Sequence, residues 1–524
     1  MARHDARSRP RAARSHADPA RRAAYDVLRA VADRDAYANL LLPALLAQRG
    51  LTGRDAAFAT ELTYGTLRGR GTYDAILAAC SDRDQLDPPV RDVLRLGAHQ
   101  LLATRVGRHA AVATSVDLAK DVCGPRPSGF VNAVLRRVAT RDLDAWLAII
   151  VPDRAQDPSG YLAVRHSYPR WIVDAFRDAL GQASAAETEE ALAAGNVRPD
   201  VVLAAVPGRA RPAAPEPPAP DLAPVPDLAP APPGLTRTRW SPYGLRLAAG
   251  DPAPLVASGQ LAVQDEASQL ASLALARVSL PPDQDRLWLD LCAGPGGKAR
   301  LLAGLAAERD ARLLASDIRP HRAGRVLAAL RRARLVPARS AGPEPAGPQP
   351  ASQESASQGS ASPEPASPEP ATPEPASGRP AAVVVADGLR VPWRPATFDR
   401  VLADVPCSNL GSLRRRPEAR WRKTPATVRE LTGVQRGLLN AAIDSVRPGG
   451  VVAYVTCSPH LAETRDVVTA VAAHRGDVAI LDAPAVLAEV PGLRGPDPRF
   501  AQFWPHRHGT DAIFLALIKR LDPG

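Results

Sequence analysis

The sequence predicts a multidomain protein: an all-helical N-terminal domain, a small α/β linking region, and a C-terminal α/β domain built on a mostly parallel sheet. Three observations support this fold class. The chain has 524 residues, which is more than one ordinary core holds. Its first part carries apolar residues at helical spacing. From about residue 255, short apolar runs alternate with helical patterns.

The composition is that of a globular protein with a positive net charge. Hydrophobic residues make up 45% of the chain, and no run of about 18 apolar residues is present to span a membrane. The charged N-terminus lacks the apolar stretch of a secretory signal, so we expect a cytoplasmic protein without a membrane partner. The net charge of +11 favours a polyanionic partner such as nucleic acid, although a GC-rich coding bias toward Arg accounts for part of it.

The N-terminal part divides into a tail and a helical domain. Residues 1–20 are rich in Arg and lack apolar periodicity, which predicts a disordered basic tail. From residue 21 the pattern is helical, because Tyr25, Leu28, Val31 and Ala32 recur at intervals of three and four. Turn signals such as Gly50 separate further apolar runs. The sequence therefore predicts a compact helical domain over residues 21–145.

Two proline-rich stretches interrupt the rest of the chain. Residues 160–250 are mixed in character and predict a small α/β subdomain, with a proline-rich insert at 207–233 that excludes regular structure. Residues 340–379 repeat an Ala-Ser-Pro-Glu-Pro theme and have almost no large apolar residues. We expect this second stretch to be a disordered insertion in one crossover of the C-terminal domain, which spans residues 255–524.

Reactive and acidic residues stand at the ends of the predicted strands. These strands are expected at Leu287–Leu291, Leu313–Asp317, Val383–Asp387, Val401–Asp404 and Val451–Thr456. Ligands of an open parallel sheet bind beyond the carboxyl ends of its strands. Asp290, Asp317, Asp387 and Asp404 occupy four of these ends, and Cys457 follows the fifth. One acid in such a position is adequately explained as a helix cap, but five such positions together indicate a site.

The glycine-rich run at 292–298 predicts a cofactor loop. Its glycines let backbone amides and a helix N-terminus approach a ligand closely. The run lacks the spacing of dinucleotide and nucleoside triphosphate motifs, and Ala299 offers no hydroxyl to magnesium. Asp317 is placed for ribose hydroxyls, and Asp387 for an adenine amino group. Together these features favour an adenosyl cofactor without phosphates. Lys298 is one of four lysines in an Arg-rich chain, so we expect its ammonium group to have a chemical function that Arg could not take over.

Two cysteines suit covalent chemistry on a pyrimidine. Cys407 follows the fourth predicted strand in Asp404-Val-Pro-Cys-Ser, and Cys457 follows the fifth in Thr-Cys-Ser. A thiolate that adds to C6 of cytosine makes C5 nucleophilic, and an acid near N3 stabilises the adduct. Packing or a metal site is the alternative, but no Cys-x-x-Cys pair or His cluster supplies further ligands, so we expect no metal. Cys80 and Cys123 are expected to be packing residues.

These motifs resemble the Fmu/Sun family of RNA cytosine-C5 methyltransferases. The resemblance rests on the run from Cys292 to Lys298, the Asp404-Val-Pro-Cys-Ser box and Thr456-Cys-Ser, and it extends to residues 263–268 and 503–511. The segments 61–68 and 129–137 resemble a NusB-type RNA-binding domain. This pairing is typical of the RsmB-type bacterial enzymes that methylate a cytosine in 16S ribosomal RNA. It implies a Rossmann-like class I methyltransferase domain that uses S-adenosyl-L-methionine and takes ribosomal RNA as its partner, free or in an early assembly intermediate.

The resemblance also implies roles for single residues. Cys457 is the expected nucleophile, Cys407 assists release of the product, and Asp404 faces the cytosine. The expected cofactor-binding residues are Cys292, Ala293, Gly294, Pro295, Gly296, Gly297, Lys298, Asp317, Asp387 and Asp404. The sequence departs from the family at Gly294, usually Ala, at Ala299, usually Thr, and at Asn409, usually Gly. We expect these departures to change loop flexibility and not to abolish activity.

Three alternatives and two further expectations accompany this interpretation. DNA cytosine methyltransferases use the Cys of the Pro-Cys box as nucleophile, so the roles of the two thiols are open to exchange. A second alternative is that the substrate is tRNA or 23S ribosomal RNA. A third is that the chain is an antitermination-type RNA-binding factor with an inactive methyltransferase fold. The small subdomain at 160–250 is expected to contact RNA. A basic loop past Cys407 is expected to hold RNA phosphates, through Arg414, Arg415, Arg416, Arg420, Trp421, Arg422 and Lys423.

Overall fold

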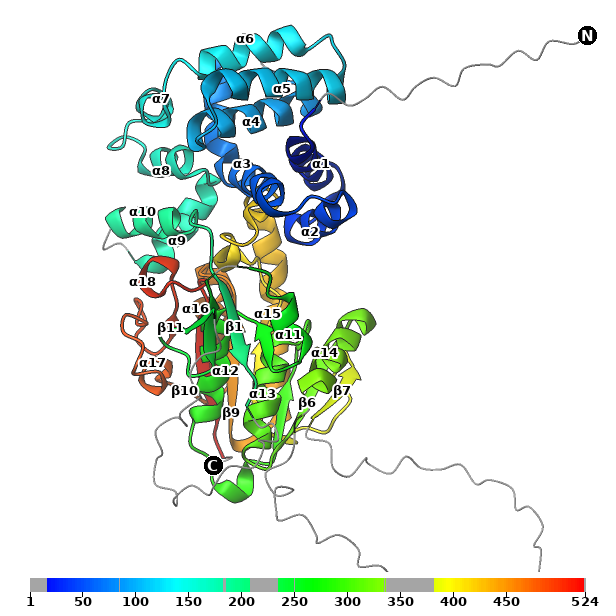
Figure 1. The fold of residues 1–524 in the computed structure, drawn as a ribbon. Helices are drawn as coiled ribbons and strands as arrows, with labels where there is room; N and C mark the ends of the chain where they lie inside the picture. Colours follow the sequence, from blue (N-terminus) through cyan, green and yellow to red (C-terminus); the bar gives the residue numbers. More distant parts are fainter. Residues whose placement is uncertain are drawn as a thin grey trace, which may run out of the picture.

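The computed structural model describes residues 17–83, 85–181, 185–207, 234–248, 250–333, 335 and 381–522. A helical region lies at one end of the molecule and a region built on a sheet at the other, where the C-terminus also lies (Figure 1). The proline-rich stretches predicted at 207–233 and 340–379 fall almost entirely outside the described residues. Within the described ranges, no helix is both long and apolar enough to cross a membrane.

The N-terminal region is all-helical, as the sequence predicts. Its helices are α1 (Pro19–Arg34), α2 (Ala38–Gln48), α3 (Gly53–Cys80), α4 (Pro88–Ala103), α5 (Arg108–Cys123), α6 (Ser128–Val138) and α7 (Leu143–Ile150). Helix α1 begins inside the range predicted as a tail, because Asp18 accepts a hydrogen bond from the Arg21 amide and Pro19 fits the first turn. Apolar faces of these helices share one buried core, which includes Leu28, Leu62 and Leu94.

A linking region follows the helical one and combines helices with a small sheet. Helices α8 (Pro158–His166), α9 (Arg170–Leu180) and α10 (Ala185–Ala194) come first. Strands β1 (Val201–Ala205), β2 (Leu235–Arg237), β3 (Gly244–Leu247) and β4 (Leu261–Val263) then form an antiparallel sheet in the order β2-β3-β1-β4, with α11 (Ala253–Ala257) before β4. Strand β4 lies past residue 255 yet pairs with β1, so the two regions interlock along the chain.

The C-terminal region has the mostly parallel sheet expected of it, in the order β10-β12-β9-β8-β5-β6-β7. The parallel strands are β5 (Leu287–Asp290), β6 (Arg312–Asp317), β7 (Ala381–Val385), β8 (Phe398–Asp404) and β9 (Val446–Thr456). Each matches a predicted strand, although β7 ends two residues before Asp387. Antiparallel β12 (Phe514–Arg520) and β10 (Val478–Leu481) complete one edge, and β11 (Ala501–Gln502) pairs with β12.

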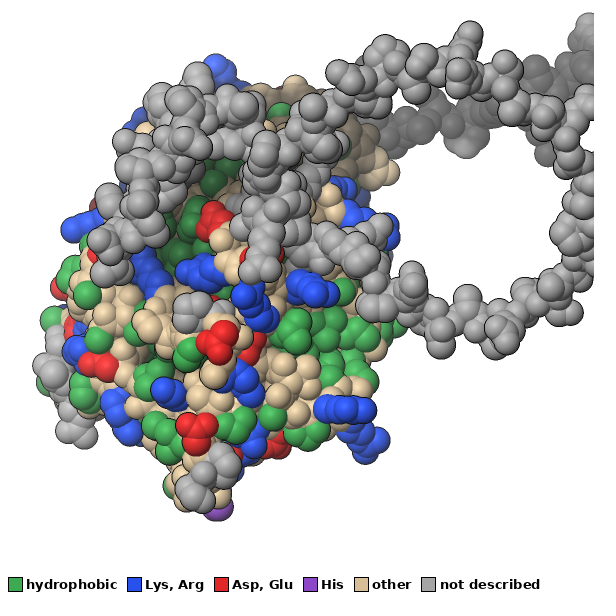
Figure 2. Space-filling view, turned by 90° about the horizontal axis from the view of Figure 1, so that it is seen from below, with side chains coloured by type: hydrophobic (Ala, Val, Ile, Leu, Met, Phe, Trp, Pro, Cys, Tyr) green, Lys and Arg blue, Asp and Glu red, His purple; other side chains and the backbone are tan. Residues whose placement is uncertain are grey.

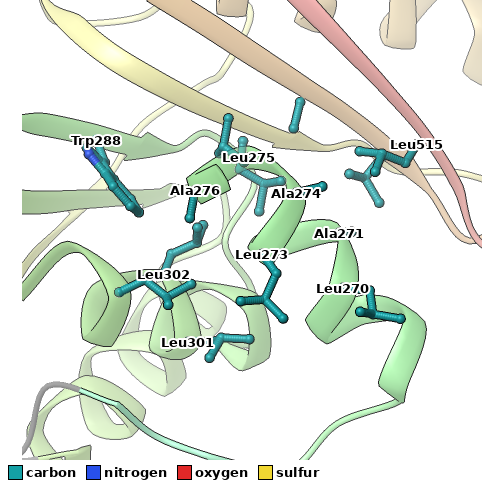
Figure 3. Close-up of a cluster of buried hydrophobic side chains, with 14 of the residues drawn as sticks. Leu270, Ala271, Leu273, Ala274, Leu275, Ala276, Trp288, Leu301, Leu302 and Leu515 are labelled. Atoms are coloured by element: carbon teal, nitrogen blue, oxygen red, sulfur yellow. The ribbon is translucent and has the colours of Figure 1, made fainter. Parts of the chain in front are cut away.

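Helices cover both faces of this sheet. On one face lie α12 (Glu266–Arg277), α13 (Gly297–Ala307), α14 (Pro320–Ala333) and α17 (Ala483–Val486). Their buried Leu and Ala side chains pack against Trp288 of β5 and Leu515 of β12 (Figure 3). On the other face lie α15 (Pro425–Ser445) and α16 (Arg465–Ala473). Burial of a Leu side chain contributes about 1.5–3 kcal/mol, so these layers hold the strand ends in fixed positions.

The carboxyl edge of the sheet faces the helical region. The chain leaves β8 at this edge, passes through the short 3-10 helices at Leu410–Ser412 and Pro417–Trp421, and enters α15. The second of these 3-10 helices contacts α3 (Figure 1). The residues at the strand ends therefore lie between the sheet and the N-terminal and linking regions.

Candidate active site

The glycine-rich loop joins β5 to α13 in a tight turn. The Ala293 amide donates to the Ser316 carbonyl at 2.8 Å, and the Gly294 amide donates to Asp317 Oδ2 at 3.1 Å. A Cβ at Gly294 would lie 2.3 Å from the same carboxylate oxygen. Gly296 has a φ of +111°, which only glycine adopts without strain. The backbone at Gly296 thus favours glycine, and the hydrogen bond from Gly294 brings the sequence-predicted loop and Asp317 together.

Helix α13 begins directly after this loop with an open N-terminus. Its N-cap residue is Gly296, so no side chain caps the first amides. Beside Gly297 lies the side chain of Gln264, which is 7% exposed and has no hydrogen-bond partner for either polar atom of its amide. The sequence interpretation did not assign a role to Gln264. A buried amide without partners is costly in a folded protein, which indicates that a polar ligand group belongs here.

Lys298 links the glycine-rich loop to the end of β8. Its Nζ donates to Asp404 Oδ2 at 2.9 Å, and its side chain is 13% exposed. Burial alone lowers the pKa of this ammonium group, but Asp404, Cys457 and Asp290 outweigh burial and raise the pKa above its ordinary value. Lys298 is therefore a fixed positive charge between the cofactor loop and the thiols, as its isolation among arginines in the sequence suggested.

Two groups at the start of the loop are held in their neutral forms. Burial, followed by repulsion from Asp404, raises the pKa of Asp290 to about 8. Burial, followed by repulsion from Asp290, raises the pKa of the Cys292 thiol well above its ordinary value. Cys292 is consequently a poor nucleophile, and its place in the loop fits a cofactor-lining role better than a catalytic one.

The remaining acids at the strand ends differ in burial. Asp317 at the end of β6 is 4% exposed and also accepts from the Arg319 amide at 2.9 Å. Asp387 is partly exposed, and its Oδ1 accepts from the Leu389 amide at 2.9 Å in its own turn. Strands β6 and β7 are neighbours, so both carboxylates stand at the same edge. The exposed apolar side chains of Ile318 and Leu389 accompany them.

The two predicted thiols lie in contact. Cys407 Sγ and Cys457 Sγ are 3.2 Å apart, because the adjacent parallel strands β8 and β9 end in register with Asp404 opposite Val455. The hydrogen bond with Cys457, together with burial, raises the pKa of Cys407 well above its ordinary value. Both effects favour the protonated form of Cys407.

A buried glutamate joins the loops that carry the thiols. Glu463 is 0% exposed and accepts from the Ser408 amide at 2.7 Å, from the Ser408 hydroxyl, and from the Ser458 hydroxyl at 2.7 Å. Gln435 on α15 donates to the same carboxylate at 3.2 Å. Ser408 and Ser458 are the residues directly after the two cysteines, so Glu463 fixes their spacing. The sequence interpretation missed Glu463, because an acidic residue in a connecting segment is expected to be exposed to solvent.

The structure contradicts the predicted role of the basic loop past Cys407. Arg414 is buried and donates to Asp265 at 2.9 Å and to Asp511 at 2.5 Å, and Arg415 pairs with the same two acids. Arg420 is fully buried, and Arg422 donates to three carbonyls of the segment 31–36. The aromatic ring of Trp421 packs against Arg70 and Gly71. Most of these side chains bind protein groups, so they are not a free surface for RNA phosphates. Arg416 remains exposed, and Lys423 is partly exposed.

No group of three or more His, Cys, Asp or Glu side chains within the described ranges has a metal-binding arrangement. The groups that the structure places at this edge include the paired thiols, the Lys298–Asp404 ion pair and the glycine-lined loop. The paired thiols and the ion pair each join segments that are far apart in the sequence.

Comparisons with known proteins agree with the site. The family described as "16S rRNA methyltransferase RsmB/F" matches residues 277–339 and 378–519, and the NusB family matches residues 18–140. A chain from Mycobacterium tuberculosis (strain CDC 1551 / Oshkosh) that bears a methyltransferase name, MT1451, is 47% identical over 96% of this chain and 97% of its own length. Ribosomal RNA small subunit methyltransferase B of Pseudomonas putida is 30% identical over 95% of this chain and 98% of its own length.

A solved structure, "Crystal Structure of PH0851", shares the fold. It superposes with a TM-score of 0.67 at 19% identity and covers 96% of this chain and 98% of its own. The two family matches fall on the helical region and on the region that carries the thiols, the glycine-rich loop and the Lys298–Asp404 pair. The chain therefore belongs to the RsmB/F family of 16S rRNA methyltransferases, as an RNA methyltransferase with an N-terminal NusB-family domain.

Proposed function

We propose that this protein methylates C5 of a cytosine in ribosomal RNA, in 16S rRNA in particular, with S-adenosyl-L-methionine as methyl donor and a covalent adduct between Cys457 and C6 of the base. The observation that carries the proposal is the pair of thiols 3.2 Å apart, beside the Lys298–Asp404 ion pair. A methyltransferase that acts on an exocyclic amine needs no thiol, whereas C5 of cytosine becomes nucleophilic only after addition at C6.

The residues present fit an adenosyl cofactor. In the loop at 292–298, glycines leave space that a Cβ would fill, and the N-terminus of helix α13 is uncapped. Asp317 and Asp387 stand at neighbouring strand ends, where they can accept from ribose hydroxyls and from an adenine amino group. Ile318 and Leu389 supply exposed apolar surface for a flat ring. When bound, the cofactor supplies an electrophilic methyl group.

The chain's own residues divide the remaining work. The Cys457 thiolate forms a bond to C6, and the electrons of the C5–C6 double bond move to C5. Asp404 faces the base near N3 in its pair with Lys298, and the Lys298 ammonium group balances the negative charge that addition places on the ring. Once C5 carries the methyl group, a base removes the C5 proton. The electron pair of that C–H bond then restores the double bond and expels the Cys457 thiolate.

Two further observations support the assignment of the thiols. The raised pKa of Cys407 favours a protonated side chain beside Cys457, which can donate a hydrogen bond to the departing Cys457 thiolate. Exchange of the two roles, as in DNA cytosine methyltransferases, would need the more buried thiol to attack: Cys407 is 6% exposed, while Cys457 is partly exposed. The intact thiols and ion pair also weigh against an RNA-binding factor with an inactive catalytic domain.

We propose a cytoplasmic enzyme with rRNA as partner. The match of residues 18–140 to the NusB family supports RNA capture by the helical region. The printed name of the Pseudomonas putida relative, a small subunit rRNA methyltransferase, favours 16S rRNA over tRNA and 23S rRNA.

The two thiols give the test. We expect Cys457→Ala to lose methyl transfer but keep its affinity for S-adenosylmethionine, because the nucleophile does not hold the cofactor. Cys407→Ala should stall after methylation and leave protein bound to RNA in denaturing gels. Bisulfite sequencing of RNA from cells with wild-type or Cys457→Ala protein should show one 16S cytosine that loses its methyl group. Turnover by Cys457→Ala would refute the nucleophile, and a lost site in tRNA or 23S rRNA would refute the substrate.

A further inference from the structure

Asn409 occupies an unusual backbone position beside the two cysteines. It is two residues past Cys407 and has a φ of +62°, in the left-handed region that Asn and Gly tolerate better than other residues. This conformation turns its side chain toward the end of β9. Asn409 Oδ1 lies 2.9 Å from Cys457 Sγ, and Asn409 Nδ2 lies 2.9 Å from the carbonyl oxygen of Cys407.

The second contact fixes how the amide is oriented. The carbonyl oxygen of Cys407 only accepts hydrogen bonds, so the NH₂ group of Asn409 must face it. The oxygen of the same amide must then face Cys457. An amide oxygen accepts a hydrogen bond from a thiol S–H group, but it repels a thiolate. The contact therefore favours Cys457 as an intact thiol with its sulfur held in one direction.

The other polar groups around Cys457 act differently. Cys407 Sγ lies 3.2 Å away and is itself a thiol, and the Lys298 ammonium group is near enough to interact with Cys457. Lys298 favours the thiolate, which attack on cytosine requires. Asn409 Oδ1, 2.9 Å from the sulfur, opposes the thiolate, so the reactivity of Cys457 depends on whether this contact is made.

We propose that Asn409 is a positioning residue that holds Cys457 as a hydrogen-bonded, weakly reactive thiol while RNA is absent, and that entry of the cytosine breaks this contact. The proposal rests on the proposed role of Cys457 as nucleophile. The family that the sequence resembles usually has Gly at this position. Because Gly tolerates the same backbone conformation, the Asn side chain adds a contact to the thiol without demanding a different loop.

Two substitutions separate this role from simple shielding. Asn409→Gly keeps the backbone conformation and removes the acceptor. Asn409→Asp keeps the size of the side chain and replaces the amide with a carboxylate, which repels a thiolate more strongly. The measurement is the rate at which iodoacetamide alkylates Cys457 at one fixed pH, in protein without RNA or cofactor, with mass spectrometry to identify the modified cysteine. The matched control is Ala396→Gly, at an exposed position with a φ of +55°.

We expect Asn409→Gly to react roughly three to ten times faster than wild type, and Asn409→Asp to react slower by a similar factor. Ala396→Gly should react like wild type. A residue that only shields the thiol would leave the Asp variant at the wild-type rate, and that result would overturn the proposal, as would changes in the same direction in both variants. This assay needs no methyl transfer, so it stands apart from the Cys457→Ala test. A Cys457→Ala protein that still methylates RNA would remove the proposed function without altering the alkylation rates.

Discussion

Burial sets the chemistry of single residues at the strand ends. Asp290 is fully buried, with neither carboxylate oxygen in a normal hydrogen bond, and its pKa is raised to about 8. Asp317, at the equivalent place one strand along, accepts from two backbone amides instead. Sequence reasoning placed both acids correctly at strand ends, because the apolar runs that form these two strands stop next to them. It did not separate their protonation states, since those depend on neighbours from other segments, such as Asp404.

The raised pKa of Asp290 predicts a pH dependence of stability. The unfolded chain ionises this carboxyl near 3.8, whereas the folded protein does so near 8. Stability should therefore fall as pH rises from about 4 to about 8, by an amount on the order of a few kcal/mol. In Asp290→Asn this contribution is absent, so its melting temperature should fall less between pH 5 and pH 8.5 than that of wild type. Asp144→Asn, at an exposed position, is the control. Parallel pH profiles for all three proteins would contradict the prediction.

At the scale of elements, the sequence predicted features that depend on neighbouring residues and missed contacts between segments that lie far apart in the chain. The five parallel strands and the glycine-rich turn follow from patterns within a few residues. The hydrogen bonds of Glu463 with Ser408 and of Asn409 with Cys457 do not, because each joins segments that periodicity cannot bring together. The loop past Cys407 shows the same limit. Its arginines have the composition of an RNA-binding loop, but Asp265 and Asp511, from distant parts of the chain, neutralise Arg414 and Arg415.

This arrangement predicts that Arg414 stabilises the fold and does not capture RNA. The Arg414 side chain and its two partners are each 8% exposed or less. Arg414→Ala leaves two buried carboxylates without that partner, which should cost about 3–5 kcal/mol in a urea titration. Arg416→Ala removes an exposed side chain stacked 5.2 Å from the Tyr37 ring and should cost less than about 1 kcal/mol. If Arg414→Ala keeps its urea midpoint but weakens the salt dependence of RNA binding, the loop contacts RNA after all.

At the scale of the molecule, the loop past Cys407 connects the C-terminal region to the helical and linking regions. The guanidinium group of Arg420 is fully buried, donates to the carbonyls of Arg68, Ser167 and Gly195, and stacks 3.7 Å from the Tyr168 ring. Glu418 accepts from the Ala38 amide at 3.2 Å. Thirteen positions separate Arg420 from Cys407 in the numbering, so the helical region is anchored close to the thiols. An RNA held by the helical region is thereby presented to the active site.

The distribution of charge on the surface predicts where RNA is captured. On the face turned away from the helical region, basic side chains are interspersed with acidic and apolar ones (Figure 2). Between α5 and α6, in contrast, a cavity of about 280 Å³ is lined by Arg108, His109, Asn132 and Arg136, with no acidic residue among its described lining. Such a cavity suits a phosphate of the RNA backbone.

We therefore expect Arg108→Ala combined with Arg136→Ala to weaken RNA binding, because the cavity then lacks the two charges that neutralise phosphates. The slope of log K against log salt should fall by roughly 0.7–0.9 for each phosphate that is no longer neutralised. The RNA KM should rise while kcat holds, because neither side chain belongs to the catalytic region and bound RNA still reaches the same thiols. Arg34→Ala combined with Arg54→Ala removes the same charge from exposed positions of the helical region outside this cavity and is the matched control. Equal salt slopes for the two double variants would show that total charge, and not this cavity, governs capture.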